Sequence, residues 1–306
     1  MAKQMQNIFI HEVGPRDGLQ VEKATVPLEE KIRWIERLLT SGVDIVQLGS
    51  FVNLEKVPQM ADTDLLFRHF AQKKPAHVTL SGLVLNEKGL ERGFACGVEM
   101  FCMGVSASET HSRKNTGMTT TEALERIIPM AKQALSAGNK VQASVQSAFG
   151  CGFEGPVSSE KVLDIVKSYL EAGIRTISLA DTAGHAHPQQ VEDLFGAIRA
   201  LEPDAELACH FHNTYGLGLA NCYAALKSGV TYFESAFGGL GGCPFTKLPA
   251  GNVCTEDLVH SLQRMGYRPN IQLDVLLDAA RQVSAFFDRE LPGFILKSGS
   301  IVDFKG

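Results

Sequence analysis

Residues 159–180 read SEKVLDIVKSYLEAGIRTISLA, and this stretch contains one predicted helix followed by one predicted strand. Its apolar residues first recur every three or four positions, which predicts an amphipathic helix over Ser159–Ala172. Ser158 supplies a hydroxyl where helices are capped, and Gly173 stands where helices commonly end. The run Thr176–Ala180 then predicts a buried strand. A helix that leads directly into a buried strand is typical of parallel α/β folds.

The same junction, a glycine between a helix and a strand, recurs at residues 41–43 and 228–230. Longer amphipathic stretches such as Leu28–Thr40 alternate with eight short apolar runs, which predict eight strands. These runs are Ile8–Val13, Val43–Leu48, Ala76–Val84, Val98–Val105, Lys140–Ser147, Thr176–Ala180, Glu206–His212 and Thr231–Ala236. Eight strand–helix pairs favour an α/β fold of the closed (β/α)8 TIM-barrel type. An open doubly wound sheet is disfavoured, because no G-x-G-x-x-G sequence follows the first run.

The chain has 306 residues, a length that suits one barrel of about 250 residues with additions. We predict a barrel over residues 1–270. Residues 271–306 are predicted to form a C-terminal helical extension packed on the barrel, with a helix over Leu273–Phe287.

Composition excludes several classes of protein. The net charge of −5 gives no basic excess for general nucleic-acid binding, and no apolar run reaches the roughly 18 residues of a membrane span. The first seven residues are polar and lack the layout of a signal peptide. Seven cysteines, an odd number scattered along the chain, do not indicate a disulfide framework. We therefore expect a cytoplasmic protein with free thiols.

Catalytic groups of TIM barrels lie at the carboxyl ends of the strands. After the first strand stands Arg16-Asp17-Gly18, where a carboxylate that could bind a metal lies beside a guanidinium; a surface ion pair in a turn is the alternative. The seventh strand ends with His210 and His212, whose side chains point to the same face because they are two residues apart. This pair favours two ligands of one divalent metal over two hydrogen-bonded strand histidines.

Glycines crowd residues 238–242 after the eighth strand, just before Cys243. A thiol on such a loop can act as an acid or base, although Cys151 on the loop after the fifth strand is an equal candidate from composition. The sixth strand ends near Ser178 and Asp181, and the fourth leads to His111. These polar side chains are candidate substrate contacts, with helix capping as the alternative.

Taken together, these segments resemble the 3-hydroxy-3-methylglutaryl-CoA lyases of the DRE-TIM metallolyase superfamily. The matching pieces are Glu12–Gln20, Ser50–Val52, Val57–Met60, Phe149–Cys151, His210–Gly216, Gly238–Asn252 and Thr255–Leu258. The resemblance implies a divalent cation held by four residues: Asp17, His210, His212 and Asn252. It further implies that Arg16 stabilises an enolate oxygen and that Cys243, rather than Cys151, transfers a proton. In the lyase reaction, Asp17 or a bound base would remove the proton of the substrate hydroxyl. Ser178 and Asp181 match substrate-side positions.

The sequence departs from this family at Gln47, where the family has a glutamate at the end of the second strand. Glutamine keeps an acceptor oxygen but replaces the negative charge with two amide donors. We therefore expect low activity on 3-hydroxy-3-methylglutaryl-CoA and higher activity on a related 3-hydroxyacyl-CoA, with unchanged substrate choice as the alternative. Residues 245–250 and the C-terminal end also differ from the usual family pattern.

The resemblance implies metal-dependent retro-Claisen cleavage of a 3-hydroxyacyl-CoA to acetyl-CoA and a 3-oxo acid. The mixed oxygen and nitrogen ligands suit Mg²⁺ or Mn²⁺, and two imidazoles also allow Zn²⁺ or Co²⁺. An acyl-CoA thioester is the expected partner, with a possible homodimer as the assembly and with no nucleic acid or membrane. Two rival functions are a Claisen-condensing enzyme that joins acetyl-CoA to a 2-oxo acid and a non-catalytic barrel that binds a metal.

Overall fold

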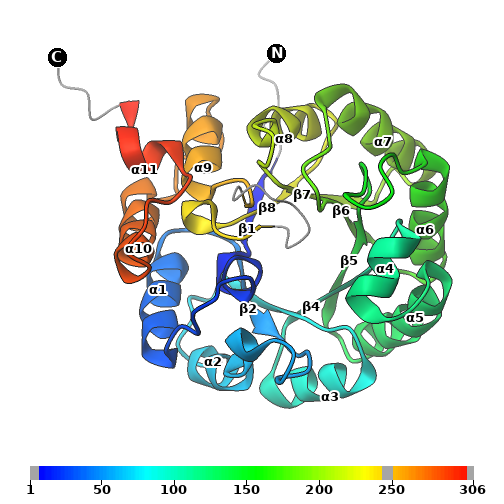
Figure 1. Ribbon diagram of the computed structural model, residues 1–306, viewed down its shortest axis with the longest axis horizontal. Coiled ribbons are helices and arrows are strands. Elements are labelled where there is room, and N and C mark those ends of the chain that lie inside the picture. Colours follow the sequence, from blue (N-terminus) through cyan, green and yellow to red (C-terminus); the bar gives the residue numbers. More distant parts are fainter. Residues whose placement is uncertain (1–6, 243–250, 302–306) are drawn as a thin grey trace.

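The computed structural model describes residues 7–242 and 251–301. Its eight strands are all parallel and close into a barrel in the order β1 to β8, with the helices outside (Figure 1). The strands are Phe9–Glu12 (β1), Ile45–Ser50 (β2), Thr79–Leu83 (β3), Met100–Ser106 (β4), Lys140–Gln146 (β5), Thr176–Asp181 (β6), Glu206–Phe211 (β7) and Tyr232–Ser235 (β8). The predicted TIM barrel is therefore confirmed, and each predicted strand is present with small shifts at its ends.

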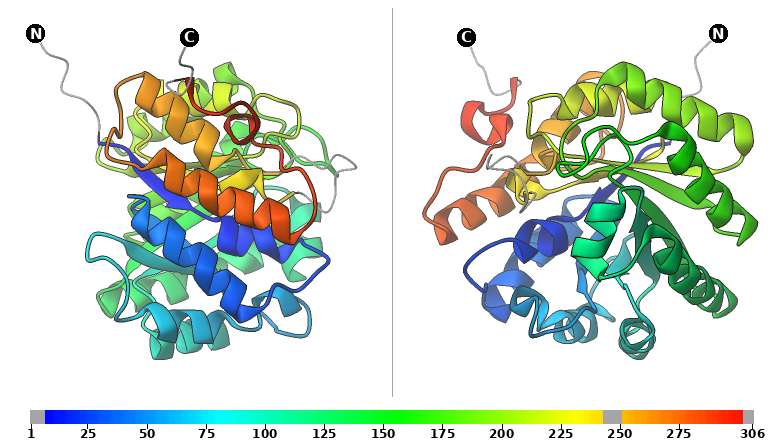
Figure 2. Two further views of the ribbon diagram at one scale, coloured as in Figure 1. Left: turned by 90° about the vertical axis from the view of Figure 1, so that its left-hand side faces the viewer. Right: turned by 45° about the vertical axis from the view of Figure 1, so that its right-hand side comes forward.

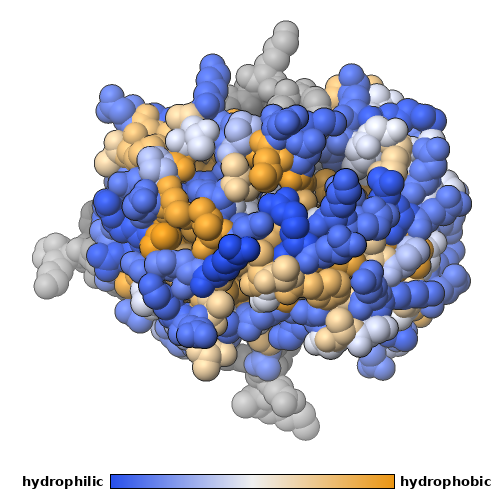
Figure 3. All heavy atoms as spheres, turned by 90° about the horizontal axis from the view of Figure 1, so that it is seen from below, coloured by the Kyte–Doolittle hydropathy of each residue, from blue (hydrophilic) through white to orange (hydrophobic). Residues whose placement is uncertain are grey.

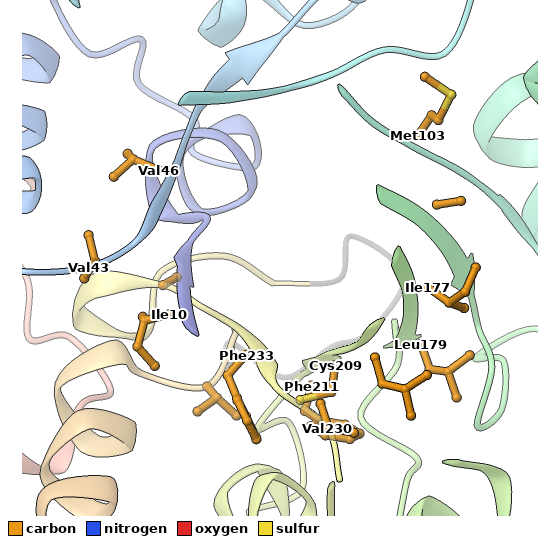
Figure 4. Packing of buried hydrophobic residues seen from close by; sticks show 14 of the residues in the cluster. Ile10, Val43, Val46, Met103, Ile177, Leu179, Cys209, Phe211, Val230 and Phe233 are labelled. Carbon is orange, nitrogen blue, oxygen red and sulfur yellow. The ribbon is translucent and has the colours of Figure 1, made fainter. Parts of the chain in front are cut away.

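Each strand is buried on both faces because one face lines the barrel and the other packs against the helices. Every residue of β2, β4 and β6 is buried. Figure 4 shows apolar side chains such as Val46, Leu179 and Phe233 in the layer between the strands and the surrounding helices. The alternate residues of the same strands point inward, so the barrel interior is where the polar side chains of the site can meet.

Most helices connect one strand to the next around the outside of the barrel (Figure 1). They are Leu28–Thr40 (α1), Thr63–Phe70 (α2), Glu87–Cys96 (α3), Glu109–Thr116 (α4), Thr120–Ser136 (α5), Ser159–Glu171 (α6), Pro188–Leu201 (α7) and Gly218–Lys227 (α8). The predicted cap of α6 is present, since the Ser158 hydroxyl accepts from the Lys161 N–H at 3.4 Å. Gly173 follows that helix with a φ of +83°, a conformation that favours glycine.

Three helices follow the last strand: Thr255–Arg264 (α9), Leu273–Phe286 (α10) and Phe294–Ser298 (α11). Figure 2 shows α10 lying beside α1, where the rings of Trp34 and Phe286 pack edge to face at 5.4 Å. Leu276 of α10 belongs to the same buried cluster as the barrel residues. The predicted helix over Leu273–Phe287 is confirmed, while the division of the chain at residue 270 stays a prediction.

Three short helical turns complete the fold: Gly14–Gly18 (η1), Pro58–Met60 (η2) and Phe237–Gly239 (η3). The first two follow β1 and β2, and the third follows β8. Figure 3 shows one face of the molecule, on which hydrophobic residues lie in separate groups among hydrophilic ones. Within the described ranges, every helix is too short or too polar to cross a bilayer.

Candidate active site

Asp17, His210 and His212 converge at the carboxyl end of the barrel. Asp17 lies in η1, His210 in β7 and His212 immediately after β7. One potential ligand atom from each lies within 4.8 Å of the other two, and all three residues are buried. The Nε2 atoms of the two imidazoles are 3.1 Å apart, and His210 Nε2 lies 3.9 Å from Asp17 Oδ2. The predicted geometry of two histidines at alternate positions on one strand is therefore present.

Asn252 joins this cluster because the chain returns from the glycine loop to the end of β7. A backbone bridge pairs Asn252 with His212, and the Val253 N–H donates to the Phe211 carbonyl at 3.0 Å. The Asn252 Nδ2 donates to Asp17 Oδ2 at 2.8 Å. Its Oδ1 is buried and finds no hydrogen-bond partner in residues 7–242 and 251–301.

These four side chains fit a divalent cation. Asp17 and Asn252 offer oxygen and the two histidines offer nitrogen, a set that Mn²⁺, Zn²⁺, Co²⁺ and related ions accept. An unpartnered buried amide oxygen is costly, and a cation in the cluster would give the Asn252 Oδ1 its missing partner. The predicted ligand set is thus brought together, and the binding of a cation by it stays a proposal.

Arg16 lies beside the cluster and between two side chains. Its Nη1 donates to Asp17 Oδ1 at 2.5 Å, and its Nε donates to the amide oxygen of Gln47. Gln47 is buried and lies inside β2, three residues before its end, instead of at the end as the sequence suggested. The guanidinium is therefore held by one charged and one neutral acceptor.

Charges in the cluster shift the pKa values of its members in opposite directions. Burial opposes ionisation of Asp17, but the charges of Arg16 and His210 outweigh it and hold the pKa of this carboxyl well below its usual range. Burial also disfavours the charged form of His210, yet its hydrogen bond to Glu234 and the negative charges of Glu234 and Asp17 raise its pKa. Burial and the neighbouring His210 lower the pKa of His212 to about 4.

Glu234 is a site residue that the sequence reasoning missed. It lies in β8, and its Oε2 is 2.8 Å from His210 Nδ1. The available signal was a glutamate within the otherwise uncharged run Thr231–Ala236. A charged side chain inside a barrel strand needs a partner, and here the partner is one of the predicted metal ligands.

A cavity of about 510 Å³ opens above the cluster. Its lining includes Arg16, Gln47, His111, Ser178 and His212. A separate hollow of about 570 Å³ lies on the outer surface at α10 and α11, away from the strand ends. The barrel cavity is therefore the one that a substrate must enter to reach the cluster.

The three candidate substrate contacts occupy different places. Ser178 lies inside β6, below its end, and is completely buried. Asp181 ends β6, but its carboxylate accepts the backbone N–H groups of His185 at 2.8 Å and Ala186 at 3.2 Å, and burial raises its pKa to about 6. His111 lines the cavity, while its backbone N–H is capped by Ser108 at the start of α4. Capping therefore describes the beginning of α4, whereas Asp181 holds the loop before α7, whose N-cap is His187. Contact of these side chains with a substrate stays a prediction.

Of the two candidate thiols, the structure describes Cys151. Cys243 lies outside the described residues. Cys151 is buried, and its backbone pairs with Gly155 in a small bridge. The other five described cysteines are also buried: Cys96, Cys102, Cys209, Cys222 and Cys254.

Comparison with known proteins identifies a single family. The model of the HMGL-like family matches residues 7–283. The hydroxymethylglutaryl-CoA lyase YngG of Bacillus subtilis is 38% identical over 287 residues, which cover 94% of this chain and 95% of that protein. The (R)-citramalyl-CoA lyase of Chloroflexus aurantiacus is 37% identical, with 97% and 96% covered. An HMG-CoA lyase from Acinetobacter baumannii, solved with coenzyme A and 3-methylmalate, superposes with a TM-score of 0.93 at 36% identity, covering 100% of this chain and 99% of that one.

Proposed function

Because the chain belongs to the HMGL-like family, we propose that it cleaves a 3-hydroxyacyl-CoA by a retro-Claisen reaction. The products are acetyl-CoA and an oxo acid, which makes the chain a carbon–carbon lyase. Relatives that cover almost the whole chain are named for this chemistry on 3-hydroxy-3-methylglutaryl-CoA and on citramalyl-CoA. A structural relative with bound coenzyme A supports an acyl-CoA thioester as the substrate.

The observation that carries this proposal is the cluster of Asp17, His210, His212 and Asn252 beside Arg16 at the floor of the barrel cavity. A divalent cation bound there would make a neighbouring hydroxyl more acidic. Mg²⁺ or Mn²⁺ is the proposed ion, with Zn²⁺ or Co²⁺ as alternatives.

In the reaction, the substrate hydroxyl gives its proton to a base bound in the cavity, the bond between C2 and C3 breaks, and C3 becomes a carbonyl. The electron pair of that bond passes to the thioester, which leaves as an enolate and takes up a proton at C2. Arg16 presents its guanidinium at the cavity, where it would stabilise the developing negative charge on the enolate oxygen. The low pKa of Asp17 makes this carboxylate a weak base, so we assign it to cation binding rather than to proton removal. Cys243 is proposed, from the family resemblance alone, to deliver the proton to the enolate carbon.

Gln47 supports a narrower proposal about the acyl group. Its amide oxygen accepts from Arg16, so the guanidinium faces one carboxylate, Asp17, where a glutamate at position 47 would supply a second. A less neutralised guanidinium can accept a substrate carboxylate close to the hydroxyl-bearing carbon. Citramalyl-CoA has its carboxylate on that carbon, whereas 3-hydroxy-3-methylglutaryl-CoA has it one methylene away. We therefore expect faster cleavage of thioesters like citramalyl-CoA, whose second product is a 2-oxo acid.

Release of acetyl-CoA from citramalyl-CoA and from 3-hydroxy-3-methylglutaryl-CoA, measured with added Mn²⁺ or with EDTA, tests the function. Metal-dependent release of acetyl-CoA from either thioester supports the lyase. If the protein binds Mn²⁺ but releases acetyl-CoA from neither thioester, the non-catalytic barrel is favoured. Net CoA release from acetyl-CoA and a 2-oxo acid, without cleavage in the other direction, would favour the condensing enzyme. Gln47→Glu is expected to raise cleavage of 3-hydroxy-3-methylglutaryl-CoA several-fold. A wild-type protein already fast on that substrate, and no faster as the Glu variant, would refute the role of Gln47.

A cytoplasmic location and a homodimer stay proposals that rest on the sequence. Size-exclusion chromatography with light scattering tests the second, since a homodimer has twice the mass of the 33.2 kDa chain.

A further inference from the structure

Glu234 is a buried carboxylate that contacts His210, one of the four proposed ligands, and the geometry points to a positioning role for it. We propose that Glu234 fixes His210 in the tautomer that carries its proton on Nδ1, so that Nε2 is left as a lone pair facing Asp17 and His212. This inference rests on the proposed function, because it assumes that the cluster binds a divalent cation.

The backbone register places the two side chains together. His210 of β7 and Glu234 of β8 are directly paired residues in neighbouring parallel strands, so their side chains project from the same face into the barrel. The Glu234 Oε2 lies 2.8 Å from His210 Nδ1. A carboxylate cannot donate, so the imidazole must be the donor at Nδ1. The other ring nitrogen is then free to bind a metal.

The carboxylate itself is held by donors from two further strands. Gln142 of β5 donates its Nε2 to Glu234 Oε1 at 2.5 Å, and Ser178 of β6 donates its hydroxyl to the same oxygen at 3.0 Å. With the bond from His210, three strands fix the orientation of a side chain that belongs to a fourth. Ser178 therefore helps to orient Glu234 in addition to lining the cavity.

The two histidines differ in this respect. His212 Nδ1 is buried and has no hydrogen-bond partner in the part of the chain that the structure describes. The orientation of His210 is thus fixed by a charged acceptor at Nδ1, while the ring of His212 meets only His210 Nε2, at 3.1 Å, among the hydrogen bonds of the described residues. A carboxylate that accepts from a metal-binding imidazole also makes the metal-binding nitrogen more basic. Loss of such a carboxylate commonly weakens metal binding about 10- to 100-fold.

Manganese binding to the metal-free protein tests this proposal without an activity assay. Glu234→Ala removes the acceptor and is expected to raise the Kd for Mn²⁺ about 10- to 100-fold in isothermal titration calorimetry. Glu234→Gln should show a smaller loss because its amide oxygen can still accept from His210 and because the unpartnered Gln142 Oε1 can accept its new N–H after an amide flip. Glu234→Met fills a similar volume without an acceptor oxygen, so a loss of affinity like that of Glu234→Ala distinguishes an acceptor from a space-filling group.

Asp257→Asn is the matched control. Asp257 lies in α9 and is also buried. Its carboxylate accepts the backbone N–H groups of Phe294 and Ile295 at 2.9 and 2.8 Å and, within the described residues, makes no hydrogen bond with the four proposed ligands. Its Mn²⁺ affinity should equal that of the wild type. Folded Glu234→Ala and Glu234→Gln variants with Kd values within twofold of the wild type would overturn the positioning role. A wild-type protein that binds no Mn²⁺ would instead refute the metal site of the proposed function.

Discussion

Glu12 gives a prediction about how stability depends on pH. This carboxyl group at the end of β1 is completely buried, and its oxygens accept three hydrogen bonds. Two come from the backbone N–H groups of Gly14 at 2.7 Å and Phe237 at 3.0 Å, and one comes from the Thr255 hydroxyl at 2.6 Å. Glu12 thereby ties η1, which carries Arg16 and Asp17, to η3 and α9.

Burial raises the pKa of Glu12 to about 8, although its three hydrogen bonds act in the opposite direction. Between the ordinary value of 4.5 and about 8, the folded protein holds a proton that the unfolded chain has released. The stability due to this group is therefore complete below pH 4.5 and is lost as the pH rises through 8. The slope approaches 1.4 kcal/mol per pH unit, which gives a loss of about 2 kcal/mol between pH 6 and pH 8.

Glu12→Gln should remove this part of the pH dependence. The amide oxygen can accept the two backbone N–H groups, while the amide N–H can donate to the Thr255 hydroxyl. Urea unfolding at pH 6, 7 and 8 would measure the free energy of unfolding for both proteins. We expect the wild type to lose about 2 kcal/mol more than the variant across this range. Equal losses would refute the reasoning, because they would mean that Glu12 carries the same charge in the folded and unfolded states.

Cys243→Ser should abolish most turnover, because a hydroxyl gives up its proton far less readily than a thiol, and should leave Mn²⁺ affinity unchanged. Cys151→Ser should have much less effect on the rate. Near-native kcat in the Cys243 variant would exclude an acid role for that thiol. Gly241→Ala should weaken Mn²⁺ binding, because Gly241 has a φ of +108° and an added Cβ would lie 2.5 Å from the Asn252 amide nitrogen. Gly242→Ala is its control, since an added Cβ there meets no described atom within 4 Å, and equal Mn²⁺ affinities of the two variants would contradict this reading.

The fold could be predicted from local patterns because the periodicity of apolar residues is a local property. The helix Leu28–Thr40 has the predicted bounds, and α10 ends one residue before its predicted end. The turn after β1 was less predictable. Gly14 allows the Phe237 ring to lie against it, since an added Cβ would be 2.3 Å from that ring, and the two residues are far apart in the sequence. Such approaches follow from barrel closure and have no local signal.

Site residues could be predicted from the sequence where reactive side chains and the alternation of a strand occur within one short segment. His210 and His212 needed only the alternation of side chains along a strand. Asn252 needed the family resemblance, because a return of the chain after the glycine loop pairs it with His212. Glu234 was missed because its partner stands on another strand, and only the register of β7 and β8 brings the two together. Asp181 was expected as a substrate contact, but Ser178, Ala180 and Thr182 line the cavity in this region and Asp181 does not. Its carboxylate accepts backbone N–H groups instead, and these hydrogen bonds could not be read from the sequence.

The central claim is that one divalent cation, held by Asp17, His210, His212 and Asn252, is required for cleavage of an acyl-CoA. The most direct test is to titrate the metal-free protein with Mn²⁺ and to measure bound metal and acetyl-CoA release in the same samples, with whichever thioester is cleaved faster. We predict that the rate rises in proportion to bound Mn²⁺ and reaches its plateau at one ion per chain. Full acetyl-CoA release by the metal-free protein in excess EDTA would contradict the claim.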